Sequence, residues 1–133
     1  MTAAALAAWR GSGDPVMLRL PGGEMPEIPI ARAWPGGAVV IKDGGDDPDV
    51  TSGCEITVTV VPFSGAPEAA DHLVPCGEGE LIVRGGPGVG RVTRPGLAVP
   101  VGLAAVNPGP RRILAENFRL AGFGRTPGER LLV

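Results

Sequence analysis

The sequence is poor in aromatic residues and in the side chains that most often form acid–base and metal sites. Tyrosine is absent, tryptophan and phenylalanine together number five, and there is a single histidine, His72. A core must therefore be built mainly from Val, Ile, Leu and Ala. His72 is predicted to lie in a polar loop and is given no role. The two cysteines, Cys54 and Cys76, lack metal-site spacing, and we expect them to be reduced thiols of a cytoplasmic protein.

Strong charge and long apolar segments are also missing. The net charge of −2 gives no general attraction to nucleic acid or to a membrane surface. The apolar residues 2–9 are too few to span a bilayer, and no signal peptide is recognised. Glycine and proline are abundant, at 22 and 15 residues, but they cluster between apolar runs, where they indicate turns.

The remaining pattern predicts an α+β fold with a short, mostly antiparallel or mixed sheet and two helices. The first helix is expected over residues 2–10, with Thr2 as its N-cap and Gly11 as its stop, and the second over residues 108–120. Residues 62–79 are expected to be loop. We expect one domain over residues 1–121 and a loose tail over residues 122–133. Strands are expected at residues 16–20, 28–34, 38–42, 54–60 and 80–84.

An acidic loop over residues 42–53, KDGGDDPDVTSG, is the first segment that suggests chemistry. Asp side chains favour turns because they bond nearby backbone N–H groups, so the loop could be purely structural. Four carboxylates repel one another, however, and would be compensated by a cation, by an arginine, or by the amino group or hydroxyls of a ligand. The spacing does not match the calcium loop of helix–loop–helix proteins.

Two further segments follow in order. Residues 85–97, GGPGVGRVTRPGL, could be a plain connection between strands or a nest of N–H groups that binds an anion. Residues 107–112, NPGPRR, place two arginines in the first turn of a helix, where the helix dipole disfavours them. They could be solvated, or together with free N–H groups they could bind carboxylates.

The three segments together resemble the front part of one enzyme family, the cobalt-precorrin-5B (C-1)-methyltransferases, or CbiD family. The family patterns are KDAGDDPDVTHG, GGxGVGxVT(K/R)PGL and PVGxxAINPVPR, and the resemblance covers roughly residues 2–120. Here Gly44, Ser52 and Gly109 stand where the family usually has alanine, histidine and valine. Ser52 removes the one side chain of the loop that could exchange a proton near neutral pH.

The resemblance implies a larger two-domain fold and methyl transfer from S-adenosylmethionine to C-1 of a cobalt-precorrin tetrapyrrole, in cobalamin biosynthesis. It also implies a partner enzyme that deacylates the ring. From the net charge and the short apolar segments we expect no nucleic-acid or membrane partner, and no residue is assigned to a metal. The family's opening motif and its larger later part are not found, so we expect this chain alone to be inactive. The alternative is a non-catalytic module that binds a corrinoid, a cation or a partner.

The resemblance and the residue chemistry give a set of candidate site residues. Arginines suit the acetate and propionate carboxylates at the rim of a precorrin ring. The candidate catalytic residues are Asp46, Asp47 and Asp49; the candidate substrate-binding residues are Arg91, Thr93, Arg94, Asn107, Arg111 and Arg112; and the candidate backbone ligand loop contains Gly85, Gly86, Gly88 and Gly90.

Overall fold

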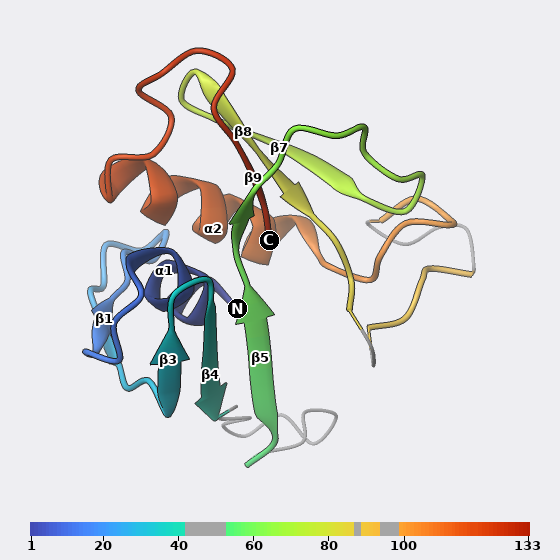
Figure 1. Cartoon of the computed structure of the whole chain (residues 1–133). Coiled ribbons are helices and arrows are strands. Elements are labelled where there is room, and N and C mark those ends of the chain that lie inside the picture. Colours follow the sequence, from blue (N-terminus) through green and yellow to red (C-terminus); the bar gives the residue numbers. More distant parts are fainter. Residues whose placement is uncertain (42–52, 87–88, 94–98) are drawn as a thin grey trace. The chain divides into compact units, whose positions relative to one another are not determined.

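The computed structural model of the chain describes residues 1–41, 53–86, 89–93 and 99–133, drawn in colour in Figure 1. The chain divides into two compact units, residues 1–60 and residues 61–133. Among the described residues, the first unit contains one helix and two small sheets and the second contains one helix and one sheet, which confirms the α+β class. In the described part of the chain, no helix is both long and apolar enough to cross a membrane.

The first unit packs an alanine-rich helix against a three-stranded antiparallel sheet (Figure 1). The helix forms as expected, and Gly11 ends it in the left-handed conformation, with φ of 73°. The expected N-cap is wrong, because Thr2 lies inside the helix and Met1 precedes it. Small side chains let the helix lie close to the sheet, where Ala38 is fully buried. The elements are α1 (Thr2–Arg10), β1 (Val16–Met17), β2 (Glu27–Ile28), β3 (Arg32–Trp34), β4 (Gly37–Ile41) and β5 (Glu55–Thr59).

The second unit is a four-stranded sheet with strand order β6-β9-β8-β7, and its helix packs on β7. β8 is antiparallel to β7 and parallel to β9. The helix α2 begins after Asn107, as expected, with prolines in its first turn. Its elements are β6 (Val61–Pro62), β7 (His72–Cys76), β8 (Gly79–Val83), α2 (Pro108–Leu120) and β9 (Arg130–Leu132).

Two expectations are corrected in this unit. Residues 62–79 are not all loop, because β7 lies within them and alternates between buried and exposed residues. Residues 122–133 are not a loose tail throughout, since β9 pairs with both β6 and β8 and buries Leu131. The expected domain boundary at residue 121 stays a prediction.

Candidate functional site

The glycine-rich segment and the segment before α2 form one hydrogen-bonded ladder. The Val92 N–H donates to the Leu103 carbonyl at 2.9 Å, and the Ala105 N–H donates to the Gly90 carbonyl at 2.8 Å. Between these bonds, Arg91 forms an antiparallel bridge with the opposite segment. Two motifs that are separate in the sequence are therefore one local structure.

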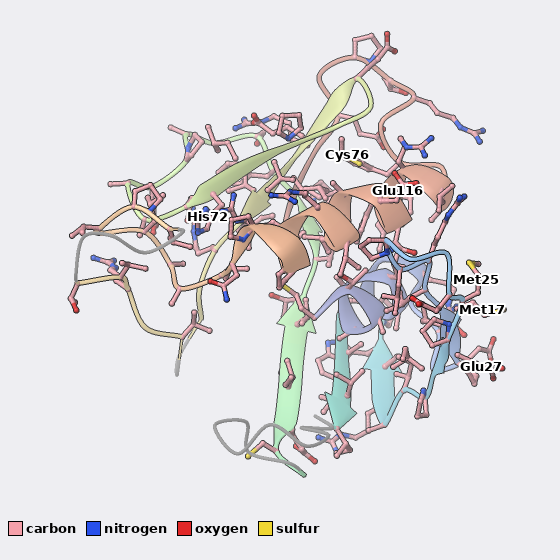
Figure 2. All side chains as sticks on the ribbon, turned by 180° about the vertical axis from the view of Figure 1, so that it is seen from behind. Met17, Met25, Glu27, His72, Cys76 and Glu116 are labelled. Atoms are coloured by element: carbon pink, nitrogen blue, oxygen red, sulfur yellow. The ribbon has the colours of Figure 1, made fainter. Side chains whose placement is uncertain are left out.

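This ladder is fixed to the start of β7 through Ala104. The Ala104 N–H donates to the Ala70 carbonyl at 3.0 Å, and the His72 imidazole donates from Nε2 to the Ala104 carbonyl at 2.7 Å. His72 is buried in β7, so its prediction as a loop residue is wrong. In Figure 2, His72 and Cys76 lie toward opposite ends of α2. The histidine thus ties the ladder to the sheet.

A small pocket of about 80 Å³ lies where the ladder meets the ends of β7 and β8. We call it the Arg84 pocket. It contains two acidic and two basic side chains, so its formal charges balance. The lining residues are Glu68, Ala70, Asp71, Arg84, Gly85, Val89, Arg91 and Ala104.

A largely buried ion pair forms one wall of this pocket. Arg84 donates from Nε to Asp71 Oδ1 at 3.0 Å and from Nη2 to Asp71 Oδ2 at 2.8 Å. The Asp71 side chain is 1% exposed, whereas that of Arg84 is 30% exposed. The hydrogen bonds from Arg84 lower the pKa of Asp71 below its ordinary value, and Asp71 in turn raises the pKa of Arg84. Both groups are therefore charged over the whole physiological range.

The two arginines at the start of α2 point to different surroundings. Arg111 is half-buried and donates from Nε to the Val106 carbonyl at 3.1 Å, which ties the helix start to the preceding segment. Arg112 is exposed and lines a second pocket, of about 210 Å³, with Cys76 and Arg119. Neither Arg111 nor Arg112 therefore lines the same pocket as Arg91.

The second pocket contains a thiol that is not reactive. Cys76 is buried near Glu116 (Figure 2), and its Sγ donates to the Ala115 carbonyl at 3.1 Å. Burial raises the pKa of the thiol, so it stays protonated near neutral pH. Both cysteines are free, in agreement with the expectation of reduced thiols.

Of the candidate residues, the structure brings Gly85 and Arg91 into the Arg84 pocket. Thr93 and Asn107 are exposed. Among the described residues, no group of three histidine, cysteine or acidic side chains could hold a metal ion. Five candidates lie outside the described residues: Asp46, Asp47, Asp49, Gly88 and Arg94.

Sequence reasoning missed Asp71 and Arg84. Arg84 directly precedes the glycine-rich segment, and this position after a strand is a signal that could have marked it. Asp71 had no comparable signal, because its partner lies 13 positions along the chain and is reached only through the β7–β8 hairpin.

Comparison with known proteins places these motifs in context. The family model named CbiD matches residues 1–124. A protein of Moorella thermoacetica named cobalt-precorrin-5B C(1)-methyltransferase is 43% identical over 86% of this chain, and a protein of Rhodospirillum rubrum with the same name is 48% identical over 83%. The matched regions are 28% and 29% of those relatives, so the chain spans less than a third of their length. No solved structure matches.

Proposed function

The chain belongs to the CbiD family, and from that membership we propose that it takes part in methyl transfer to C-1 of cobalt-precorrin-5B. The proposed donor is S-adenosylmethionine, and the proposed pathway is cobalamin biosynthesis. Relatives from three genera, all named cobalt-precorrin-5B C(1)-methyltransferase, support this proposal. We also propose a cytoplasmic location, where the free thiols of Cys54 and Cys76 would stay reduced.

The ladder between the two motifs is the observation that carries the proposal. It fixes Arg91 beside Gly85, so a cation and a side-chain-free backbone segment line the same pocket. Neither the Gly85 nor the Gly86 N–H donates to a described residue. An arginine and N–H groups without an acceptor among the described residues are suited to an anionic group of the substrate.

The sizes of the two pockets suggest which part of the substrate they take. Pockets that enclose whole drug-sized ligands have volumes of about 300–1,000 Å³. At about 80 and 210 Å³, both pockets described above are smaller and would hold single ring substituents rather than a macrocycle. We therefore propose that the chain on its own binds the substrate by its carboxylate rim without methylating it.

The transfer itself depends mainly on geometry. The sulfonium, the methyl group and the acceptor carbon must lie in line, so the protein contributes chiefly by positioning. We propose the carboxylates of Asp46, Asp47 and Asp49 as the catalytic groups. Thr93, Arg94, Asn107, Arg111 and Arg112 remain proposed substrate contacts, and other enzymes of the pathway remain proposed partners.

The proposal is tested by titrating cobalt-precorrin-5B with the chain and following the visible absorbance of the corrinoid. Arg91→Ala should raise the dissociation constant about tenfold, since a charge-assisted contact is lost. Arg125→Ala is the control, because Arg125 is exposed and lines neither pocket. Equal affinities for both variants would contradict the role of Arg91, and a chain that does not bind the corrinoid would contradict the proposed function.

A further inference from the structure

We propose that the Arg84 pocket is a carboxylate-binding subsite in which Arg84 is the principal ligand and Glu68 is a built-in competitor. Neither side chain belongs to a motif of the sequence, and neither was a candidate site residue. Naming the ligand as an acetate or propionate substituent of the corrinoid rests on the proposed function. The recognition of a carboxylate does not, because it follows from the pocket itself.

The guanidinium of Arg84 is held in place before any ligand arrives. Asp71 accepts two of its five N–H groups in a fork, which leaves three for other acceptors. The guanidinium also lies over the Phe63 ring, with Cζ 5.8 Å from the ring centroid. Because the side chain is still 30% exposed and lines the pocket, its remaining donors are accessible to a ligand.

Asp71 also lines the pocket, but its carboxylate is fixed and cannot reorient toward a ligand. Its Oδ2 also accepts the Glu68 N–H at 2.8 Å, so both of its oxygens are occupied and its side chain is 1% exposed. Asp71 cancels one positive charge formally, but Arg91, which also lines the pocket, supplies a second. The site therefore keeps an excess of hydrogen-bond donors where a carboxylate would lie.

Gly85 keeps the pocket open. A Cβ at this position would lie 2.9 Å from Val89 Cγ1 and 3.3 Å from Ala104 Cβ, so any larger residue would press on both walls. The remaining volume of about 80 Å³ has room for a carboxylate with one or two attached carbons. That limit favours the end of a short carboxylic acid chain over a bulky anion.

Glu68 is a second carboxylate beside Arg84, and its side chain is held only loosely. Its Oε2 lies 3.6 Å from Arg84 Nε, which is longer than a hydrogen bond, and its side chain is 64% exposed. Exposed ion pairs of this kind contribute little, so an incoming carboxylate can displace it. The Glu68 backbone stays fixed by Asp71, and only the side chain needs to move.

The test is a titration of the chain with sodium propionate at constant ionic strength, followed by the NMR shifts of the Gly85 and Ala104 amides. Arg84→Lys should weaken binding about tenfold, because lysine lacks the fork of donors. Glu68→Gln should tighten it about twofold to fivefold, because the competitor is gone. Propionamide, which has the same shape without the charge, should not bind.

The Glu80–Arg130 pair is a matched control on the same sheet. Arg130 also lies over the Phe63 ring, at 5.0 Å, and its Nε is 3.4 Å from Glu80 Oε1, but neither residue lines the pocket. Arg130→Lys and Glu80→Gln should leave propionate affinity unchanged. Equal effects in both pairs, or no preference for propionate over propionamide, would overturn the subsite. Propionate binding without any binding of cobalt-precorrin-5B would keep the subsite and contradict only the proposed function.

Discussion

Two ion pairs that each contain two hydrogen bonds differ in how much water reaches them. In the Asp71–Arg84 pair the carboxylate is 1% exposed, whereas in the Glu55–Arg32 pair of the first unit the carboxylate is 51% exposed. Water screens the second pair and competes for its hydrogen bonds. Only the first pair is expected to matter for stability.

We predict that Asp71→Asn lowers the free energy of unfolding by about 1–3 kcal/mol, because it leaves buried donors with a poorer acceptor. Glu55→Gln should produce no measurable change. Urea unfolding followed by circular dichroism checks both variants. A loss for Glu55→Gln as large as that for Asp71→Asn would contradict the argument from burial.

The same pair predicts how stability depends on pH. The pKa of Asp71 is lower in the folded chain than its ordinary value of 3.8, chiefly because of the hydrogen bonds from Arg84. The contribution of ionised Asp71 to the free energy of unfolding is therefore fully present above about pH 4, and it is lost as the pH falls through the pKa of the folded state. The difference in unfolding free energy between wild type and Asp71→Asn should be constant from pH 5 to 7 and shrink below pH 4. A difference that persists undiminished at pH 2.5 would contradict it.

At the residue scale, a site residue could be predicted from the sequence only where its interaction partners are close to it along the chain. Gly85 and Arg91 could be named as candidates because their motif is local and distinctive. Asp71 and His72 were not, since their partners Arg84 and Ala104 are reached only through sheet pairing and the ladder. Polar residues that are satisfied across a fold look like loop residues in the sequence.

At the scale of elements, two backbone segments lie in close contact at glycine residues. One is the turn between β7 and β8, and the other is the segment that follows α2. Gly124 has φ of 85°, and its carbonyl accepts the Glu78 N–H at 2.7 Å. A Cβ at Gly124 would overlap the Cys76 carbonyl, and one at Gly77 would lie 2.7 Å from the Gly124 oxygen. The approach therefore requires glycine on both sides.

We predict that Gly124→Ala lowers the free energy of unfolding by about 2–4 kcal/mol, through backbone strain and a steric overlap together. Gly128→Ala is the matched control: Gly128 has φ of 78°, but nothing lies within 4 Å of its Cβ position. It should lose only the conformational part, about 1 kcal/mol. Thermal unfolding of the two variants checks this, and equal losses would show that the contact with Cys76 does not matter.

The sequence predicted some elements well and missed others for identifiable reasons. The strict alternation near β5 and the Asn-Pro-Gly-Pro start of α2 are local signals, and both elements form where expected. β7 was missed because all of its residues were predicted to belong to a loop over residues 62–79. It is an edge strand of the described sheet, where proline is tolerated, and its sequence does not show the alternation, because the polar His72 is buried and the apolar Leu73 is exposed.

At the scale of the whole molecule, the parallel pairing of β8 with β9 is the feature furthest from local prediction. About fifty residues separate the two strands, and they include the ladder and α2. The three residues of β9 carry no pattern long enough to identify a strand. Yet β9 lies between β6 and β8, so the four-stranded sheet exists only because this segment is present.

We therefore predict that removing residues 129–133 unfolds the second unit and leaves the first unit folded. Without β9, the sheet is reduced to the β7–β8 hairpin and an unpaired β6, and Leu131 is lost from the core. The helix and sheets of the first unit are formed by residues 1–60 alone. Hydrogen exchange should show that the amides of Leu81 and Ile82 lose their protection, while those of Val39 and Val40 keep it.

The double substitution Leu131→Ala and Leu132→Ala separates the stabilising effect of the β9 side chains from that of the β9 backbone hydrogen bonds. It removes the apolar side chains of β9 but keeps the hydrogen bonds to β6 and β8. It should weaken protection in the second unit less than the deletion does, since the sheet can still form. Protection that falls equally in both units would mean that the chain unfolds as a single cooperative body, and the division at residue 60 would then have no energetic counterpart.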